Sequence, residues 1–459
     1  MAGLWGRAMG AEFKAKGANC QLGPGLNVAR VPQGGRNFEY MSGEDPLLGS
    51  MLVGPAVQGI QSNGVIATAK HYILNNQEWC RGNMSADVDE RTIMEIYHPP
   101  FEAAVKAGVG SIMCGYNRIN GVYTCENEQT LDKHLRKFDG FDGFVMSDWG
   151  GTHSTGLAAR TGLDMEMPGG TWFTPAKLDA ALASGALTSD VIDTQATRIL
   201  TAMYRVGIMD TPQPSGNSAV NATSEAHAAL AQHLAEQAAV LLKNDQSLLP
   251  LRGKKGATIA VIGAAADCNA TTPSVPNWGW APSVGCLSSG GGSGSVAASY
   301  VTPILAAIQQ QAAAAGMRVV YSSGQDARSA GRLAAAAEVA VVVVGTTSGE
   351  SADRNDTSLP ADQLEYLRAV ARAQTKTVVV AMSPGSMTMD WADEVASVLC
   401  FFMPGQGQGG AVARVLFGDV NPSGKTPVTM PRTDNEMGFT ASMYPGLDEH
   451  GNPVPSDCN

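Results

Sequence analysis

The sequence lacks clusters of basic residues, long apolar runs and closely paired cysteines, and each absence excludes a class of protein. Its 31 Lys and Arg residues are outnumbered by 42 Asp and Glu residues, and no segment concentrates the positive charge that nucleic acid would require. No stretch of about 18 uninterrupted apolar residues predicts a membrane-spanning helix. The eight cysteines form no CxxC pair and no zinc-type cluster with histidine, so we expect no metal and no other cofactor.

Charged residues are also few, at 16%, whereas 44% are hydrophobic, which is typical of a folded, enzyme-like chain. A length of 459 residues favours about two or three domains. Four N-x-[ST] sequons, at Asn83, Asn221, Asn269 and Asn355, favour an extracellular protein or one of the secretory pathway. The first residues nevertheless lack the pattern of a signal peptide, so the chain is interpreted as beginning within a domain.

Residues 1–209 alternate short apolar runs with amphipathic segments. Five runs end in polar or glycine-rich residues: "ANCQLGP", "GVIATAKH", "VGSIMCGYN", "GFVMSDWG" and "GLDMEMPGG". This alternation predicts parallel strands joined by helices, as in a (β/α) barrel, whose active sites gather at the C-terminal ends of the strands. Five strands are too few for closure, so the sequence predicts an α/β fold that starts with an incomplete (β/α)8-type barrel.

The rest of the chain divides into three further segments. Residues 210–227 are rich in Pro, Ser, Asn and Gly and are interpreted as a linker. Residues 228–431 carry five Val-rich runs without polar alternation, which predicts an α/β/α sandwich with a sheet buried on both faces. Residues 432–459 are turn-rich and expected to be a loosely ordered tail. The stretch "SSGGGSGS" at 288–295 lacks the spacing of a phosphate loop and is interpreted as a flexible surface loop.

Several polar residues end the predicted barrel strands and are candidates for chemistry. Asp148 follows one apolar run, where a carboxylate can approach a substrate from a rigid support, although a helix cap or loop ion pair is the alternative. Asp164 and Glu166 compete with it by the same argument. Lys70 and His71 end another run and would donate hydrogen bonds to sugar hydroxyls or phosphate, or else form a structural ion pair.

Three further residues are candidates on their chemistry alone. Arg36 has a planar donor fork suited to vicinal oxygens, although a lone arginine is usually solvated or paired. Trp149 would offer an apolar face to a sugar ring or simply pack. Glu350 follows a Val-rich run, at the edge where ligands approach open α/β sheets. The alternative is a solvated acidic residue in a loop.

Several stretches of the sequence, taken together, are highly specific for one protein family. "GLNVARVPQGGRNFEYMSGEDPLLG", "ATAKHYILNNQE", "GFVMSDWGGTHST" and "SGESADRNDTSLP" resemble glycoside hydrolase family 3, β-glucosidase type, and the resemblance covers nearly the whole chain. It implies a barrel joined to an α/β/α sandwich, with the active site between them. It also implies that Asp148 is the nucleophile and Glu350 the acid/base.

The resemblance implies roles for eight more residues. Hydrogen-bond donors to the innermost sugar are Arg36, Lys70 and His71; pocket-lining residues are Met113, Tyr116 and Trp149; Glu39 and Asp45 would orient the cationic donors. The implied reaction is exo-acting, retaining hydrolysis of terminal non-reducing β-D-glucosyl residues in a β-glucoside or short β-glucan oligosaccharide. Such a reaction needs two carboxyl groups about 5–5.5 Å apart. We expect Arg36 and Lys70 to keep Asp148 ionised, and Glu350, farther from these cations, to hold the proton.

The sequence departs from the family pattern at both ends. It contains neither the upstream aspartate of a DGP-type motif nor the fibronectin-like domain that often follows the sandwich, so the chain is interpreted as truncated at both ends. The alternatives are a catalytically impaired carbohydrate-binding remnant, or β-xylosidase or hexosaminidase specificity. The cysteine pairs 114 and 125, and 268 and 286, are spaced for disulfides that close short loops.

Overall fold

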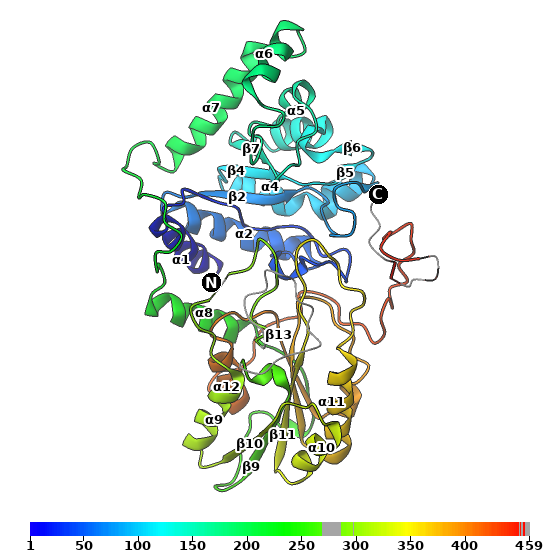
Figure 1. The fold of residues 1–459 in the computed structure, drawn as a ribbon. Coiled ribbons are helices and arrows are strands. Elements are labelled where there is room, and N and C mark those ends of the chain that lie inside the picture. Colours follow the sequence, from blue (N-terminus) through cyan, green and yellow to red (C-terminus); the bar gives the residue numbers. More distant parts are fainter. Residues whose placement is uncertain (269–285, 297, 449, 451–452, 455–459) are drawn as a thin grey trace. The chain divides into compact units, whose positions relative to one another are not determined.

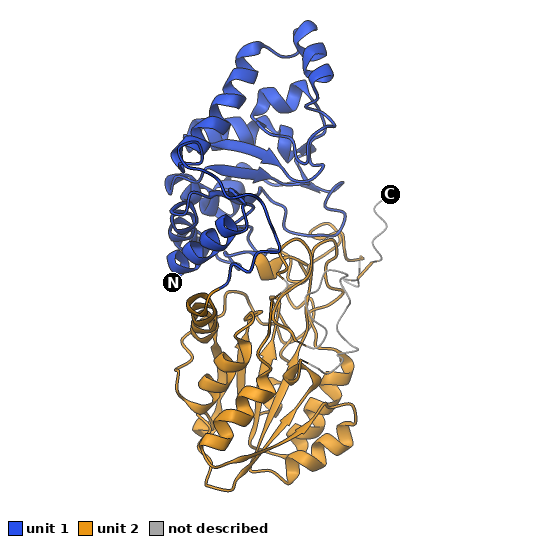
Figure 2. Ribbon diagram, turned by 60° about the vertical axis from the view of Figure 1, so that its left-hand side comes forward, with its two compact units in different colours: residues 1–30, 40–223, 456–459 blue, residues 31–39, 224–455 orange. Residues whose placement is uncertain are grey.

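The computed structural model describes residues 1–268, 286–296, 298–448, 450 and 453–454. The described residues form two compact units (Figure 2). Unit 1 comprises residues 1–30 and 40–223, and unit 2 comprises residues 31–39 and those from 224 onward. The nine residues 31–39 thus interrupt unit 1 in sequence but belong to unit 2.

Unit 1 is built on a parallel sheet with the strand order β1-β2-β4-β7. These strands are β1 (Cys20–Gln21), β2 (Ile66–Tyr72), β4 (Ser111–Cys114) and β7 (Phe144–Ser147). Every residue of β2, β4 and β7 is buried, which explains why apolar residues dominate these runs. The fifth predicted strand joins the sheet only through a parallel bridge between Met165 and Met146.

Helices and a second, small sheet surround this core (Figure 1). The helices are α1 (Ala2–Ala15), α2 (Pro46–Gln61), α3 (Glu90–Thr92), η2 (Ile93–Tyr97), α4 (Pro99–Lys106), η3 (Thr124–Glu126), η4 (Gln129–Phe138), α5 (Gly156–Thr161), α6 (Pro175–Ala183) and α7 (Ser189–Arg205). The small sheet comprises β3 (Ser85–Ala86), β5 (Arg118–Ile119) and β6 (Val122–Tyr123). Helix α1 packs closely on α2, where a Cβ atom on Gly6 would lie 2.3 Å from the carbonyl oxygen of Ala56.

Unit 2 contains a six-stranded sheet with the order β10-β9-β11-β12-β13-β8. The strands are β8 (Val240–Asn244), β9 (Thr258–Ile262), β10 (Arg318–Ser322), β11 (Val339–Gly345), β12 (Thr377–Met382) and β13 (Ser397–Phe401). Five of them are parallel and correspond to the five Val-rich runs. The sixth, β8, pairs antiparallel with β13 and was not predicted, because only its first residue is buried.

Helices cover both faces of this sheet, as an α/β/α sandwich requires. The helices are α8 (Glu225–Ala238), α9 (Ile304–Ala314), α10 (Ala327–Ala335), α11 (Ala361–Ala373) and α12 (Gln408–Phe417), and short 3₁₀ turns are η1 (Asn37–Glu39), η5 (Asp245–Ser247), η6 (Ala264–Ala266) and η7 (Ala392–Glu394). Val341 and Val343 pack with α8, α9 and α12, whereas Val342 and Val344 pack with α10 and α11. The two-residue alternation of β11 therefore feeds two separate apolar cores.

The C-terminal stretch is turn-rich but not loosely attached, so the expectation of a loose tail is wrong for its described residues. Tyr444 and Leu447 are each 3% exposed. Asp434 accepts hydrogen bonds from the backbone N–H and the hydroxyl of Thr357, at 2.9 and 2.7 Å. The stretch is therefore a packed part of unit 2.

Both proposed cysteine pairs, Cys114–Cys125 and Cys268–Cys286, form disulfides. Among the described helices, none is both long and apolar enough to cross a membrane.

Candidate active site

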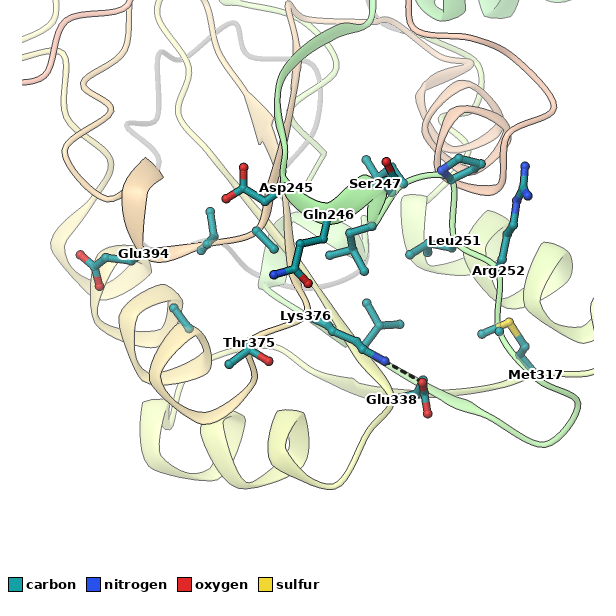
Figure 3. A pocket seen from close by; sticks show the side chains of 18 of the residues that line it. Asp245, Gln246, Ser247, Leu251, Arg252, Met317, Glu338, Thr375, Lys376 and Glu394 are labelled. Carbon is teal, nitrogen blue, oxygen red and sulfur yellow. Dashed lines mark hydrogen bonds and ion pairs between the residues drawn. The ribbon is translucent and has the colours of Figure 1, made fainter.

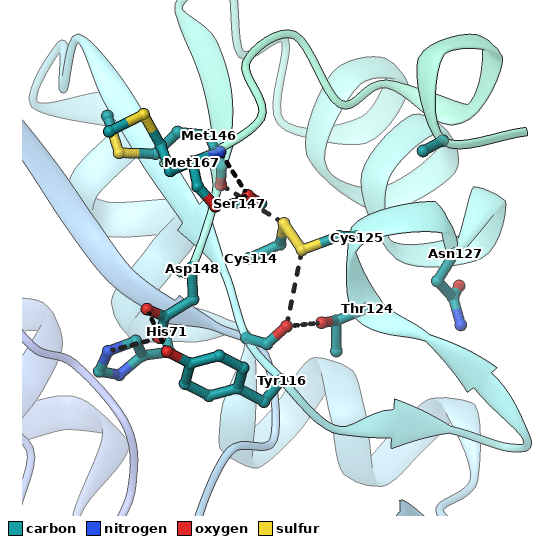
Figure 4. The surroundings of a disulfide bond; sticks show 12 residues. His71, Cys114, Tyr116, Thr124, Cys125, Asn127, Met146, Ser147, Asp148 and Met167 are labelled. Carbon is teal, nitrogen blue, oxygen red and sulfur yellow. Dashed lines mark hydrogen bonds and ion pairs between the residues drawn. A yellow bond between two sulfur atoms is a disulfide. The ribbon is translucent and has the colours of Figure 1, made fainter. Parts of the chain in front are cut away.

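Asp148 directly follows β7, and two hydrogen bonds hold one oxygen of its carboxylate (Figure 4). Its Oδ1 accepts hydrogen bonds from the Tyr116 hydroxyl at 2.8 Å and from the Trp149 backbone N–H at 2.7 Å. Its own backbone N–H donates to the Cys114 carbonyl at 3.2 Å, which fixes the main chain. Within the described part of the chain Oδ2 accepts no hydrogen bond, although the residue is only 7% exposed.

His71, in β2, lies beside that second oxygen. Its Nε2 lies 3.4 Å from Asp148 Oδ2, and its Nδ1 lies 3.0 Å from the Tyr40 hydroxyl. Asn27 fixes the His71 backbone by accepting its N–H at 2.7 Å and donating to its carbonyl at 3.1 Å. When the Tyr40 hydroxyl donates to Nδ1, the ring proton resides on Nε2 and faces Asp148.

The other predicted residues of unit 1 lie near the same strand ends. Lys70 precedes His71 in β2 and is 9% exposed, while Trp149 follows Asp148 and is 45% exposed. The Arg81 guanidinium stacks over the Tyr116 ring, 4.4 Å from its centroid. Met113 belongs to a buried apolar cluster with Ile66, Phe144 and Met146.

Glu350 lies in unit 2, in the loop that follows β11. Its Oε1 accepts a hydrogen bond from Arg36 at 3.2 Å, and its Oε2 accepts the Ser293 backbone N–H at 2.8 Å. Arg36 is 2% exposed and also donates two hydrogen bonds to Glu39, at 3.0 and 2.7 Å. The structure therefore brings together three of the predicted residues, Arg36, Glu39 and Glu350.

This arrangement corrects two expectations. Glu350 was expected to lie far from the cationic donors, but it forms an ion pair with Arg36. The stretch 288–295 was interpreted as a flexible loop, but Gly291 forms a bridge with Gly349 and Ser293 binds Glu350.

Ser293 was not identified from the sequence, although the run of glycines next to it indicated a close backbone approach. Gly292 has a φ of +99°, and a Cβ atom there would lie 2.3 Å from the Glu350 Cβ. A glycine run next to a candidate carboxylate thus indicates a close backbone approach.

The competing carboxylates of unit 1 have structural partners. Asp164 is buried between Arg136 and Arg198 and accepts the Val145 backbone N–H at 2.7 Å. Burial raises the pKa of the Asp164 carboxyl and lowers the pKa of Arg136 to about 10. Glu166 accepts three backbone N–H groups, from residues 171–173. Asp164 therefore links β7 to η4 and α7, and Glu166 stabilises a loop.

Asp45 caps a helix. Its carboxylate accepts the Leu47 N–H at 2.8 Å, at the start of α2, and the residue is exposed. This is the usual arrangement of an aspartate N-cap.

A separate pocket of about 750 Å³ lies in unit 2, at the start of β11 and β12 (Figure 3). Gln246 and the ion pair between Lys376 and Glu338, at 2.9 Å, line it. Glu350 follows the opposite, C-terminal end of β11, so this pocket contains no candidate catalytic residue. Among the described residues, no group of three or more His, Cys, Asp or Glu side chains is placed to hold a metal ion.

Comparison with known proteins places these two α/β units among the glycoside hydrolases. Residues 2–202 match the N-terminal domain of glycosyl hydrolase family 3, and residues 239–454 match the C-terminal domain of the same family. The chain belongs to glycosyl hydrolase family 3.

Curated relatives of the chain carry β-glucosidase names. The chain is 40% identical to "Probable beta-glucosidase L" of Emericella nidulans, over 94% of this chain and 62% of the relative. It is 38% identical to "Thermostable beta-glucosidase B" of Acetivibrio thermocellus, over 93% of this chain and 55% of the relative. The chain thus spans less than two thirds of the length of these relatives.

The chain is also similar to solved structures of β-glucoside-hydrolysing enzymes. The β-D-glucoside glucohydrolase of Trichoderma reesei superposes with a TM-score of 0.85 at 36% identity, covering 94% of this chain and 63% of that one. DesR, a β-glucosidase of Streptomyces venezuelae solved in complex with D-glucose, superposes with a TM-score of 0.87 at 28% identity, covering 98% and 71%.

Proposed function

We propose that the chain is a retaining, exo-acting β-glucosidase that releases terminal β-D-glucosyl residues through a covalent glycosyl-enzyme intermediate. The observation that carries the proposal is the Asp148 carboxylate, which is held at one oxygen and has no hydrogen bond at the other among the described residues. The β-glucosidase names of the relatives and the glucose complex of DesR support a glucoside substrate.

In this proposal Asp148 is the nucleophile. Two donors hold Oδ1, so the orientation of the carboxylate is set before substrate binds, as preorganised catalysis requires. Oδ2 then attacks the anomeric carbon, and the aglycone oxygen leaves. His71 stays beside Oδ2, where its Nε2 limits the rotation of the carboxylate.

Glu350 is the proposed acid/base. It gives its proton to the departing glycosidic oxygen and, in the second step, removes a proton from the water that hydrolyses the intermediate. Arg36, Lys70 and His71 donate hydrogen bonds to sugar hydroxyls, Met113, Tyr116 and Trp149 shape the sugar site, and Glu39 orients Arg36 through two hydrogen bonds. The disulfides of both units support an extracellular or secretory location, where the environment is oxidising.

Two substitutions test the assignment. Asp148→Asn should abolish turnover of p-nitrophenyl β-glucoside while the circular dichroism spectrum stays unchanged, because an amide cannot form the covalent intermediate. Glu350→Gln should slow cellobiose by about 10²–10⁴-fold but dinitrophenyl β-glucoside far less, because a good leaving group barely needs the proton. Asp179→Asn, an exposed carboxylate of α6, is the matched control and should behave as the wild type.

Equal losses on both substrates for Glu350→Gln would refute its role as the acid. Glucose binding by the wild-type chain without release of nitrophenol would identify a carbohydrate-binding remnant instead of an enzyme. Faster turnover of aryl β-xylosides or N-acetyl-β-glucosaminides would refute the glucosidase specificity.

A further inference from the structure

The loop that carries Glu350 contains a second, partly buried carboxylate contact, made by Asp353. Its Oδ1 accepts the Gly35 backbone N–H at 2.8 Å, and its Oδ2 accepts the Tyr444 hydroxyl at 2.7 Å. Gly35 and Tyr444 are far from Asp353 in sequence, at separations of 318 and 91 residues. One carboxylate therefore joins three distant segments of unit 2.

The segment 31–39, called the strap below, is aligned with this loop by further contacts. The Arg354 backbone N–H donates to the Gln33 carbonyl at 2.9 Å. Gly35 lies so close to the loop that a Cβ atom there would be 2.1 Å from the Ala352 carbonyl oxygen. The backbone of the strap thus has one register against the loop, and the Asp353 bond lies at the point of closest approach.

This register sets the position of Arg36 relative to Glu350. Arg36 directly follows Gly35, and Glu350 precedes Asp353 by three residues, so the Gly35–Asp353 bond lies beside the Arg36–Glu350 pair. Arginine has a long side chain that loses considerable rotamer entropy when it is fixed. Because Arg36 is part of the strap, a shift of the strap would change the 3.2 Å contact that Arg36 makes with Glu350.

Tyr444 keeps the other side of Asp353 in place. It is 3% exposed, and burial, with the adjacent Asp353 charge, raises the pKa of its hydroxyl. The hydroxyl therefore remains a donor at neutral pH and continues to bind Asp353. The C-terminal stretch is thereby linked to the Glu350 loop.

We propose that Asp353 is a positioning residue for the glycosidase reaction: by binding Gly35 and Tyr444, it holds the strap against the Glu350 loop and so places the acid/base. The inference rests on the proposed role of Glu350. In this role Asp353 acts through Arg36 and Glu350.

The test compares substrates that need the acid with substrates that do not. Asp353→Ala removes both hydrogen bonds and should lower kcat on cellobiose at least about tenfold more than kcat on dinitrophenyl β-glucoside, because a displaced acid transfers its proton poorly. Asp353→Asn should recover most of the difference, since the amide oxygen still accepts the Gly35 N–H. Tyr444→Phe, which removes one of the two bonds, should give a smaller loss of the same kind.

Asp356→Ala is the matched control, because this exposed aspartate of the same loop accepts the Ser358 N–H and, like Asp353, interacts electrostatically with Arg354, so the variant controls for the loss of a negative charge from the loop. It should leave both rates unchanged. Equal losses on both substrates for Asp353→Ala would mean that Asp353 only stabilises the fold, and unchanged rates would also overturn the proposal. If Asp353→Ala does not fold, the ratio of kcat on cellobiose to kcat on dinitrophenyl β-glucoside in Tyr444→Phe tests the proposal in its place.

Measuring Glu350→Gln alongside distinguishes failure of the positioning role of Asp353 from failure of the acid/base role of Glu350. If it shows the selective loss on cellobiose and the Asp353 and Tyr444 variants do not, only the positioning role fails. If Glu350→Gln itself shows no selectivity, the acid/base assignment fails, and the Asp353 inference fails with it.

Discussion

The Cys114–Cys125 disulfide lies beside Asp148, and replacing both cysteines with alanine should destabilise unit 1 without stopping catalysis. The cysteines are separated by 11 residues. In the chain-entropy model, a cross-link that closes a loop of about 12 residues stabilises the folded state by about 3 kcal/mol. Both cysteines are at most 1% exposed, so the lost packing of two sulfur atoms adds to this cost.

Catalysis should persist because other contacts hold Asp148. The Cys114 carbonyl, which accepts the Asp148 N–H at 3.2 Å, belongs to the backbone and remains in the alanine variant. Strands β4 and β7 stay paired from Ser111–Phe144 to the final pair, Cys114–Ser147. We therefore expect nearly unchanged turnover of p-nitrophenyl β-glucoside well below the unfolding temperature.

Urea unfolding, followed by tryptophan fluorescence, measures the loss. Cys20→Ala is the control, because Cys20 is a free thiol in the same unit. Reduced wild-type protein should be at least as unstable as the double variant, because reduction also breaks the Cys268–Cys286 disulfide. A difference below about 1 kcal/mol between the double variant and Cys20→Ala would refute the reasoning, since it falls well short of the entropic contribution of such a loop. Free thiols at both positions in unreduced, denatured protein would refute the disulfide itself.

Two further predictions concern buried groups. Asp164→Asn should lower the free energy of unfolding by about 3–5 kcal/mol, because Arg136 and Arg198 lose the carboxylate that pairs with both of them. Urea unfolding measures this loss. A loss no larger than that of the control variant Asp179→Asn would contradict the prediction. Burial raises the pKa of the Cys400 thiol to about 12, so iodoacetamide at pH 8 should label Cys400 only after denaturation, as peptide mass spectrometry would show; labelling of the native protein would contradict the burial.

Much of the fold could be predicted from local pattern. The Val-rich runs form β9 to β13, because strands buried on both faces need apolar residues at every position. Strand β8 was missed, because an edge strand with one buried residue has no such pattern and directly follows α8. The π-helical turns η2 and η4 were also beyond prediction, since their spacing is close to that of an α-helix.

The candidate site of unit 1 followed from a simple rule, and that of unit 2 did not. Asp148 and His71 come together because parallel strands end at the same edge of a sheet. The pairing of Arg36 with Glu350 was not predicted, because the strap pairs with a loop more than 300 residues away. No local pattern encodes such a pairing, and the only nearby signals were the glycines at 35 and 292, where the backbones meet.

The position of Arg36 changes how the proposed acid/base must work. One guanidinium faces two carboxylates, and Glu39 holds it through two hydrogen bonds, whereas Glu350 makes one, at the longer distance of 3.2 Å. A proton on Glu350 therefore weakens a single contact and leaves Arg36 fully paired with Glu39. A proton on Glu39 would instead disrupt the bidentate pair, the stronger of the two arrangements. Glu350 can thus alternate between acid and base without leaving a buried cation uncompensated, and distance from the cations is not required for that role.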